Sequence, residues 1–326
     1  NGQYNLSRSK VIIIGAGGIG STVILYLAGA GIGRLDILDY DIVEESNLHR
    51  QIIHIEEGSK LKEYKAESAC KRIKLLNSNI QTKAIITKLT YLNAIEIFQE
   101  YDVIIDATDN YEARYSINDA CVQLKKPLIS GSAVGMEGQV TVFPCDKVSP
   151  CYRCVYPQPS FAESCRSCAN AGVLGPVPGL IGSLQAIETI KLLTRLDQNN
   201  ITGVSLLIGK QVYYDGIFGE FHTFTLPPRK KTCISCGDDV INNQELIAPP
   251  SINLNPTGLP SLDDNYRIST TNYHNILQSG MKHILLDVRS ELQFQMISLP
   301  IEKYNTIDLN SINYVNIPYS NLKNNS

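Results

Sequence analysis

Six of the nine cysteines in this chain stand in C-x-x-C pairs, a spacing that brings two thiols close enough to share one metal ion. In an intracellular protein such pairs indicate metal or redox chemistry rather than a disulfide framework. By spacing alone, the first two pairs would form a tetrahedral zinc site together. Cys70 and Cys121 lie in predicted helices and are expected in the core. The three pairs, in chain order, are Cys151/Cys154, Cys165/Cys168 and Cys233/Cys236.

A glycine-rich run, GAGGIG at residues 15–20, follows a buried β-rich stretch and precedes a helical one. Glycines in that position let a phosphate-bearing ligand approach the backbone, and the helix N-terminus offers free N–H groups. Asp39 ends the next predicted strand, where a Rossmann acidic residue meets a ribose hydroxyl. Taken alone, these features indicate a nucleotide site with NAD or FAD as the default ligand.

Charged side chains further along the chain change this interpretation. An acidic cluster that begins at Asp41 leads to Arg50, Lys65 opens the next helix, and Asp109 follows another buried strand. The carboxyl ends of parallel strands converge on one crevice, so these residues and Asp39 are expected to face one pocket. One arginine, one lysine and two carboxylates suit a triphosphate with Mg²⁺, held by Asp109. An oxidoreductase would leave three of these side chains unexplained.

The elements that must position these residues alternate between strand and helix, which predicts a doubly wound, Rossmann-like, mostly parallel sheet. After residue 136 the pattern changes, and residues 138–143 alternate like an antiparallel strand. The α/β fold is therefore expected to continue into antiparallel strands. Expected strands are 10–14, 34–39, 83–87, 102–107, from 127, 203–209, 211–214 and 221–226. Expected helices are 21–30, 66–76, 91–101, 111–124 and 180–196, with a loop at 151–179.

The length of 326 residues suits one large domain, 1–248, and a small α/β module, 266–326, joined by a polar linker at 249–265. A formal net charge of −3 gives no basic footprint for nucleic acid. The apolar runs are too short to span a bilayer, and no secretory signal opens the chain. Abundant Asn and Ile indicate an AT-rich plastid or reduced genome. We therefore expect a reducing plastid stroma or cytoplasm and neither nucleic acid nor membrane as a partner.

Seven sequence runs between residues 10 and 240 are VIIIGAGGIGS, DILDYDIVEESNLHRQ, YKAES, DATDNYEARY, GQVTVF, CYRCVYPQP and GVLGP with GLIGSLQAIE. In their residues, order and spacing they resemble the MoeB/ThiF family of ubiquitin-activating-enzyme-like adenylyltransferases. The resemblance implies that ATP and a small ubiquitin-like sulfur carrier ending in Gly-Gly yield a carrier acyl-adenylate and pyrophosphate. It also implies a homodimer.

The resemblance assigns roles to residues of these runs. Asp39 would contact the ribose, Asn47, Arg50 and Lys65 the phosphates, and Asp109 the Mg²⁺. Because a carboxylate is already a nucleophile, catalysis would consist of alignment and charge neutralisation. The implied ATP-binding set is Gly15, Gly17, Gly18, Gly20, Asp39, Ser46, Asn47, Leu48, His49, Arg50, Lys65, Asp109 and Asn110.

For the cysteines, the resemblance implies a structural zinc held by Cys151/Cys154 with Cys233/Cys236, against the shorter spacing favoured above. Cys168 would then be a catalytic nucleophile that takes the activated carrier, and a passive loop thiol is the alternative. Cys165 keeps the short-spacing zinc site open.

Residues 283–318 resemble the first part of a rhodanese-like domain, with the signature LLDVR at 285–289, then Glu291, Phe294 and NIP at 316–318. No cysteine follows Cys236, so we expect no sulfurtransferase activity here and a docking element or remnant instead. The module and CYRCVYPQP favour a MoaD-like subunit of molybdopterin synthase as the carrier, hence molybdenum cofactor biosynthesis. The alternatives are a ThiS-like carrier for thiamine thiazole synthesis and a weakly active carrier-binding scaffold.

Overall fold

The computed structural model describes residues 2–157, 172–194 and 205–238, with shorter pieces between 272 and 316. The chain divides into two compact units, residues 1–258 and 259–326. Residues 239–271 lie outside the described part, and with them the whole of the expected linker. The domain limits at 248 and 266 therefore stay predictions.

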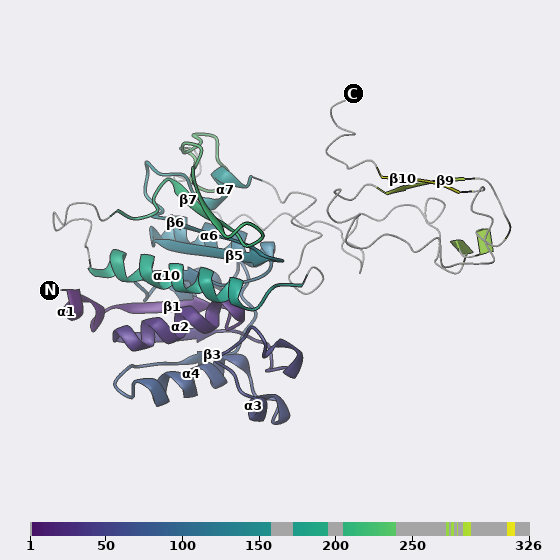
Figure 1. The fold of residues 1–326 in the computed structure, drawn as a ribbon. Coiled ribbons are helices and arrows are strands. Elements are labelled where there is room, and N and C mark those ends of the chain that lie inside the picture. Colours follow the sequence, from purple (N-terminus) through teal and green to yellow (C-terminus); the bar gives the residue numbers. More distant parts are fainter. Residues whose placement is uncertain are drawn as a thin grey trace. The chain divides into compact units, whose positions relative to one another are not determined.

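The first unit is built on one eight-stranded sheet with the order β3-β2-β1-β4-β5-β6-β7-β8 (Figure 1). Neighbouring strands from β3 to β5 pair in parallel, and those from β5 to β8 pair antiparallel. This order confirms the predicted Rossmann-like, mostly parallel sheet that continues into antiparallel strands. The strands are β1 (Lys10–Ile14), β2 (Arg34–Leu38), β3 (Ala84–Ile85), β4 (Val103–Asp106), β5 (Leu128–Val134), β6 (Glu137–Phe143), β7 (Lys210–Asp215) and β8 (Glu220–Thr225).

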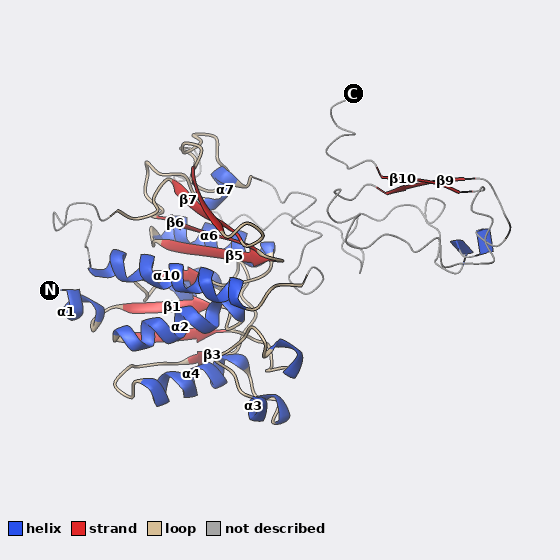
Figure 2. Ribbon diagram, viewed as in Figure 1, coloured by secondary structure: helices blue, strands red, loops and turns tan. Residues whose placement is uncertain are grey.

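Helices cover both faces of the parallel part of this sheet (Figure 2). One core cluster lies under α2, α4 and α10, and the other lies under α5 and α6. The helices are α1 (Gly2–Leu6), α2 (Gly18–Ala30), η1 (Glu45–Asn47), α3 (Glu56–Lys60), α4 (Lys65–Leu76), α5 (Ala94–Phe98), α6 (Tyr111–Leu124), α7 (Tyr152–Val155) and α10 (Pro176–Thr194).

The central strand β1 shows why its sequence has no polar alternation. Val11 and Ile13 belong to the first core cluster, while Ile12 and Ile14 belong to the second. Both faces of the strand are thus buried under helices, and an apolar side chain is favourable at each position. The burial of β1 fixes its position in the middle of the sheet, and the glycine run follows its carboxyl end.

Several expected ranges differ from the structure. The helix expected at 91–101 is only Ala94–Phe98, the strand expected at 83–87 is only Ala84–Ile85, and the loop expected at 151–179 contains the short helix Tyr152–Val155. The helix expected from residue 180 begins at Pro176, because proline is tolerated in the first helical turn, where its missing N–H has no partner to lose. Residues 205–207 form no strand, and Ile208 makes only an isolated bridge to Val142 before β7 begins. Gly209, with φ +66°, turns the chain between the two.

In the second unit, β9 (His283–Asp287) pairs in parallel with β10 (Ile312–Asn316). Part of the LLDVR signature forms β9. Glu291, Phe294 and most of the rhodanese-like prediction lie outside the described residues. None of the helices described in either unit is long and apolar enough to cross a membrane.

Candidate functional site

A cavity of about 300 Å³ opens at the carboxyl edge of the parallel strands, within the size range of small-ligand sites. The structure brings the predicted charged residues into its wall: Asp39, Arg50, Lys65 and Asp109 all line it. Of the other predicted ATP-binding residues, Gly15, Gly17, Gly18 and Asn110 line it too, whereas Gly20, Ser46, Asn47, Leu48 and His49 do not.

The glycine turn connects β1 to α2 through a close approach to the end of β4. Gly15 has φ +96°, and a Cβ there would lie 2.7 Å from the Ala107 carbonyl oxygen. Gly20 is required for packing, since a Cβ on it would lie 2.1 Å from the Gly15 oxygen. Gly17 is the N-cap of α2 and supplies no side-chain cap. The first amides of α2 therefore remain for an anionic ligand, which the helix dipole favours.

Asp39 follows β2 and is held by two backbone amides. Its Oδ2 accepts from the Ala16 N–H at 2.7 Å, and its Oδ1 accepts from the Asp41 N–H at 2.8 Å. Burial raises the pKa of this carboxyl above its ordinary value, while Lys65 and the two amides oppose that rise. Both oxygens keep a lone pair, so the carboxylate is a fixed acceptor for hydroxyl groups.

Lys65 is buried at the start of α4 and forms an ion pair with half-exposed Asp41, Nζ to Oδ2 at 2.8 Å. The Lys65 N–H also donates to the Asp41 carbonyl at 2.8 Å. A phosphate that enters the pocket thus meets an ammonium that already has one carboxylate partner. Asp41 lines the pocket but was not among the predicted site residues; its place two residues after Asp39 was the available signal.

Arg50 reaches the pocket on a turn that its neighbours stabilise. Asn47 Oδ1 accepts from Arg50 Nη2 at 2.6 Å, and His49 Nε2 lies 3.2 Å from Nη1. The Ser46 carbonyl lies 3.0 Å from His49 Nδ1, and Leu48 ends the short η1 helix. The SNLHR run therefore orients one guanidinium, and the structure places Asn47 and His49 behind Arg50 rather than in the cavity wall.

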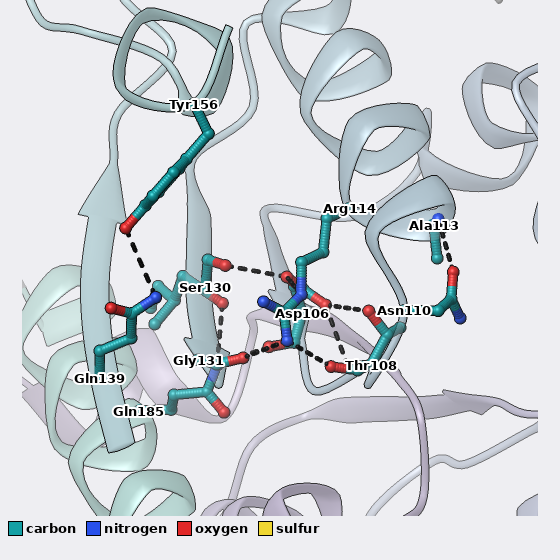
Figure 3. Close-up of polar contacts among 11 residues, drawn as sticks. Asp106, Thr108, Asn110, Ala113, Arg114, Ser130, Gly131, Gln139, Tyr156 and Gln185 are labelled. Atoms are coloured by element: carbon teal, nitrogen blue, oxygen red, sulfur yellow. Dashed lines mark hydrogen bonds and ion pairs between the residues drawn. The ribbon is translucent and has the colours of Figure 1, made fainter. Parts of the chain in front are cut away.

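The two sequence neighbours of Asp109, Thr108 and Asn110, are each held by hydrogen bonds (Figure 3). The N–H and hydroxyl of Thr108 donate to Asp106 Oδ1 at 3.0 and 2.7 Å, and its carbonyl accepts from Arg114 Nη2 at 2.8 Å. On the other side, Asn110 Oδ1 caps α6 by accepting from the Ala113 N–H. The backbone is thus held on both sides of Asp109, which lines the cavity and offers a carboxylate, a ligand type that suits Mg²⁺.

The same close-up shows how the end of β4 is joined to β5 and α10 (Figure 3). Ser130 donates to Asp106 Oδ2 at 2.8 Å, and Gln185 Nε2 donates to the Asp106 carbonyl at 2.7 Å. Asp106 and Arg114 belong to the DATDNYEARY run, whose sequence alone predicts no role for them. Their contacts show that part of this run positions Asp109.

Other pocket residues escaped the sequence interpretation because they belong to no charged motif. Gln51 lines the pocket, and its Oε1 is buried without a hydrogen-bond partner in the described part of the chain. Residues 88–91 form an outer wall. The pairing of β3 with β2 brings this loop to the pocket, and no periodicity or spacing in its sequence predicts that position.

A second constellation lies away from the pocket, where the segments after β6 and β8 meet. Four buried thiols have Sγ atoms that all lie within 4.8 Å of one another. Three of the Sγ pairs are 3.9, 3.7 and 3.4 Å apart, close to the roughly 3.8 Å edge of a tetrahedron with metal–sulfur bonds of about 2.3 Å. The thiols belong to Cys151, Cys154, Cys233 and Cys236.

This four-thiol cluster is docked on α6. Arg153, almost fully buried, donates to Asp119 at 2.6 and 2.8 Å, and the Tyr152 N–H donates to Asn118 Oδ1. The donor set fits a structural zinc, since four thiolates without an open position form a closed site. Cys165 and Cys168 lie outside the described residues, so the nucleophile and the short-spacing zinc pairing are not placed.

Cys121 is buried against the second core cluster, and burial raises the pKa of its thiol well above the ordinary value. Cys70 is partly buried, and burial raises its thiol pKa too. The predicted core position is confirmed for Cys121, whereas Cys70 packs against the first core cluster without being fully buried. Thiols whose pKa is raised by burial are poor nucleophiles.

Comparisons with known proteins agree with this geometry. A model described as "ThiF family" matches residues 1–235. "Adenylyltransferase and sulfurtransferase MOCS3" of Culex quinquefasciatus is 41% identical over 304 residues, which cover 92% of this chain and 67% of that protein. The Arabidopsis thaliana protein of the same name is 39% identical over 336 residues, covering 99% and 66%. "Adenylyltransferase and sulfurtransferase UBA4" of Candida albicans is 40% identical over 303 residues, covering 91% and 68%.

This chain thus spans about two thirds of the length of these relatives. Among solved structures, Escherichia coli MccB with ATP matches with a TM-score of 0.62 at 24% identity, covering 72% of this chain and 68% of that one. MccB with MccA-N7isoASN gives 0.62 at 23% identity, covering 73% and 69%. These likenesses establish the fold.

Proposed function

This chain belongs to the ThiF family, and from that premise we propose that it is an adenylyltransferase that uses ATP to activate the C-terminal glycine carboxylate of a small ubiquitin-like sulfur carrier. The observation that carries the proposal is the convergence of an uncapped helix N-terminus, a fixed carboxylate, two cations and a second carboxylate on one cavity. A dinucleotide oxidoreductase needs the helix N-terminus and the fixed carboxylate, but it does not need the two cations or the second carboxylate.

Each part has a task in the reaction. The α2 amides, Arg50 and Lys65 bind phosphate oxygens, and Asp39 accepts from the ribose hydroxyls. Asp109 is the residue that would hold Mg²⁺, whose charge would offset that of the phosphates. A carboxylate oxygen of the carrier attacks the α-phosphorus, the bond to the bridging oxygen breaks, and pyrophosphate leaves. The described pocket needs no general base, because the nucleophile is already ionised at neutral pH.

We assign the carrier to the MoaD-like class and the pathway to molybdenum cofactor biosynthesis, because the CYRCVYPQP run and the rhodanese-like module favour that branch of the family. Three relatives named "adenylyltransferase and sulfurtransferase", at 39–41% identity, support the activity. A ThiS-like carrier is the alternative. The decisive assay is ATP–pyrophosphate exchange with each carrier in turn. Exchange that depends on the MoaD-like carrier supports the assignment, whereas exchange with the ThiS-like carrier alone transfers the function to thiazole synthesis. Carrier binding without exchange would make the chain a scaffold.

Zinc in the four-thiol cluster is part of the same proposal, as a structural metal that joins the segments after β6 and β8. Because the described thiols are all unpaired, a reducing compartment, plastid stroma or cytoplasm, suits the protein. Cys168 as a covalent nucleophile and a homodimer as the working assembly remain predictions. Mass spectrometry of a carrier–protein conjugate in a Cys168→Ser variant tests the first, and light scattering tests the second.

A further inference from the structure

A buried imidazole lies directly behind the glycine turn. His54 is 5% exposed and follows Gln51, whose carbonyl accepts from the His54 N–H at 3.1 Å. Its Nε2 lies 2.8 Å from the Ala16 carbonyl oxygen, and its Nδ1 lies 2.9 Å from Ser68 Oγ. His54 is absent from the residues that line the pocket, so it has no direct contact to offer a ligand.

The contact with Ala16 places one ring proton. A carbonyl can only accept, so Nε2 donates to it, and in the neutral ring Nδ1 then accepts from the Ser68 hydroxyl. Burial lowers the pKa of His54, opposed by the bond to Ala16, and nearby Lys65 lowers it further. The lowered pKa favours the neutral ring, in the tautomer that carries its proton on Nε2. Ser68, itself buried, belongs to α4, three residues after Lys65.

The geometry clamps two consecutive peptide units of the turn. The Gly15–Ala16 unit is held at its N–H by Asp39, and the Ala16–Gly17 unit is held at its carbonyl by His54. In a planar trans peptide the carbonyl and the N–H point in opposite directions. A hydrogen bond to the Ala16 oxygen thus fixes the direction of the Gly17 N–H on the other side of that plane, and Gly17 lines the pocket.

Without such a clamp, a glycine run would sample several backbone conformations, and nucleotide binding would have to order it. His54 also links the elements that carry the phosphate-binding cations, since it follows the Arg50 turn and bonds to α4 through Ser68. We propose that His54 is a positioning residue that holds the glycine turn in the conformation that accepts ATP and keeps it in register with Arg50 and Lys65. This inference rests on the proposed function for its kinetic readout and extends it to a residue outside the cavity wall.

The test compares His54→Leu, which keeps the volume but removes the donor, with His54→Gln, whose amide nitrogen takes the place of Nε2. His54→Leu is expected to raise the KM for ATP about tenfold, the effect of leaving a buried carbonyl without its hydrogen bond. The KM for the carrier should stay unchanged, because the glycine turn is proposed to bind ATP and not the carrier. His54→Gln should restore most of the ATP affinity, and Ser68→Ala should raise the KM for ATP by a smaller factor, about threefold.

Calorimetric titration of each variant with ATP alone provides a readout that does not depend on a carrier. A normal ATP affinity in folded His54→Leu, or an equal loss in His54→Gln and His54→Leu, would overturn the clamp. If His54→Leu does not fold, the other two variants decide the matter. An ATP affinity of His54→Gln close to that of the wild type, with a loss of about threefold in Ser68→Ala, supports the clamp. An unchanged affinity in Ser68→Ala would overturn it. Should the wild type bind ATP but show no exchange with any carrier, the proposed function fails while the clamp is still tested by calorimetry.

Discussion

The candidate nucleotide pocket is built on the parallel half of the sheet, whereas the four-thiol cluster is built from the segments that follow β6 and β8. In the pocket, hydrogen bonds from outside the ligand site hold the candidate residues in place. Two amides hold the Asp39 carboxylate, Asn47 holds the Arg50 guanidinium, and the bonds of Thr108 and Asn110 hold the backbone on either side of Asp109. In the cluster, the nearest polar groups of the thiols are largely one another.

This difference predicts two ways of failing. A pocket side chain can be removed without loss of the fold, because the sheet and its hydrogen bonds keep the backbone in place. Removal of a thiol should cost stability, because the sulfurs join two segments whose cysteines are 82 residues apart in sequence. The pocket should therefore lose activity, and the cluster should lose metal and stability.

The largest effect is expected at Asp109, the carboxylate proposed to hold Mg²⁺. Asp109→Asn keeps the size of the side chain but removes its charge, and exchange should fall by at least about a thousandfold, since metal stabilisation of phosphate charge contributes several kcal/mol. The unfolding midpoint should stay close to that of the wild type. Asp102→Asn, at the opposite end of β4, is the matched control and should exchange normally. Near-wild-type exchange by Asp109→Asn would remove this residue from the mechanism.

Next in size is the loss of a thiol from the cluster. Cys233→Ser should lose bound zinc, measured by atomic absorption, and should unfold at a clearly lower temperature, because structural zinc contributes folding energy directly. Cys70→Ser serves as the control and should keep its metal, since Cys70 lies outside the cluster. Zinc that stays tightly bound in Cys233→Ser would instead favour the pairing of Cys151/Cys154 with Cys165/Cys168.

A smaller effect of opposite sign is expected at Asp41. ATP phosphates must compete with this carboxylate for Lys65, so Asp41→Asn should lower the KM for ATP by about two- to fivefold, in line with a partly exposed ion pair worth up to about 1 kcal/mol. Lys65→Ala should raise the same constant. A higher KM in Asp41→Asn would show that the carboxylate itself serves the nucleotide or its metal.

The smallest effect concerns pH and stability. The pKa of His54 is lowered by burial, so the unfolded chain binds its proton at a higher pH than the folded chain does. Its contribution to stability is therefore intact above its ordinary pKa of about 6.5 and declines as pH falls below that value. The slope is at most about 1.4 kcal/mol per pH unit. Urea unfolding between pH 7.5 and 5.5 should show a steeper decline for the wild type than for His54→Gln, and parallel curves would contradict this.

Local patterns predicted the elements that depend on local chemistry. The bounds of β1 and α6 match the expected ranges, because a run of four apolar residues ended by glycine and an Asn-capped helix each carry their own signals. The start of α10 was missed because Pro176, Pro178 and Gly179 indicate a loop. These prolines stand in the first helical turn, and Gly182 lets α10 pack closely on α2, where a Cβ would lie 2.2 Å from the Ile19 oxygen.

The site shows the same division. Asp39 and Asp109 were predictable, because they follow the carboxyl ends of β2 and β4, and such ends converge in parallel sheets. Arg50 and Lys65 lie in the connection that follows β2, and they were predictable from their charge and their place soon after that strand. The partners that hold them were not. His54 and Asp41 lie in the connections between regular elements, where His54 contacts the Ala16 carbonyl and Asp41 pairs with Lys65. No spacing rule in the sequence predicts these two contacts.

The most direct test of the account is mass spectrometry of a MoaD-like carrier incubated with the protein, ATP and Mg²⁺ under pyrophosphatase. We predict that the intact carrier gains one AMP at its C-terminal glycine, and that a carrier lacking that glycine gains none. An unmodified intact carrier, with a protein shown by calorimetry to bind ATP, would contradict the claim that this pocket adenylates a protein tail.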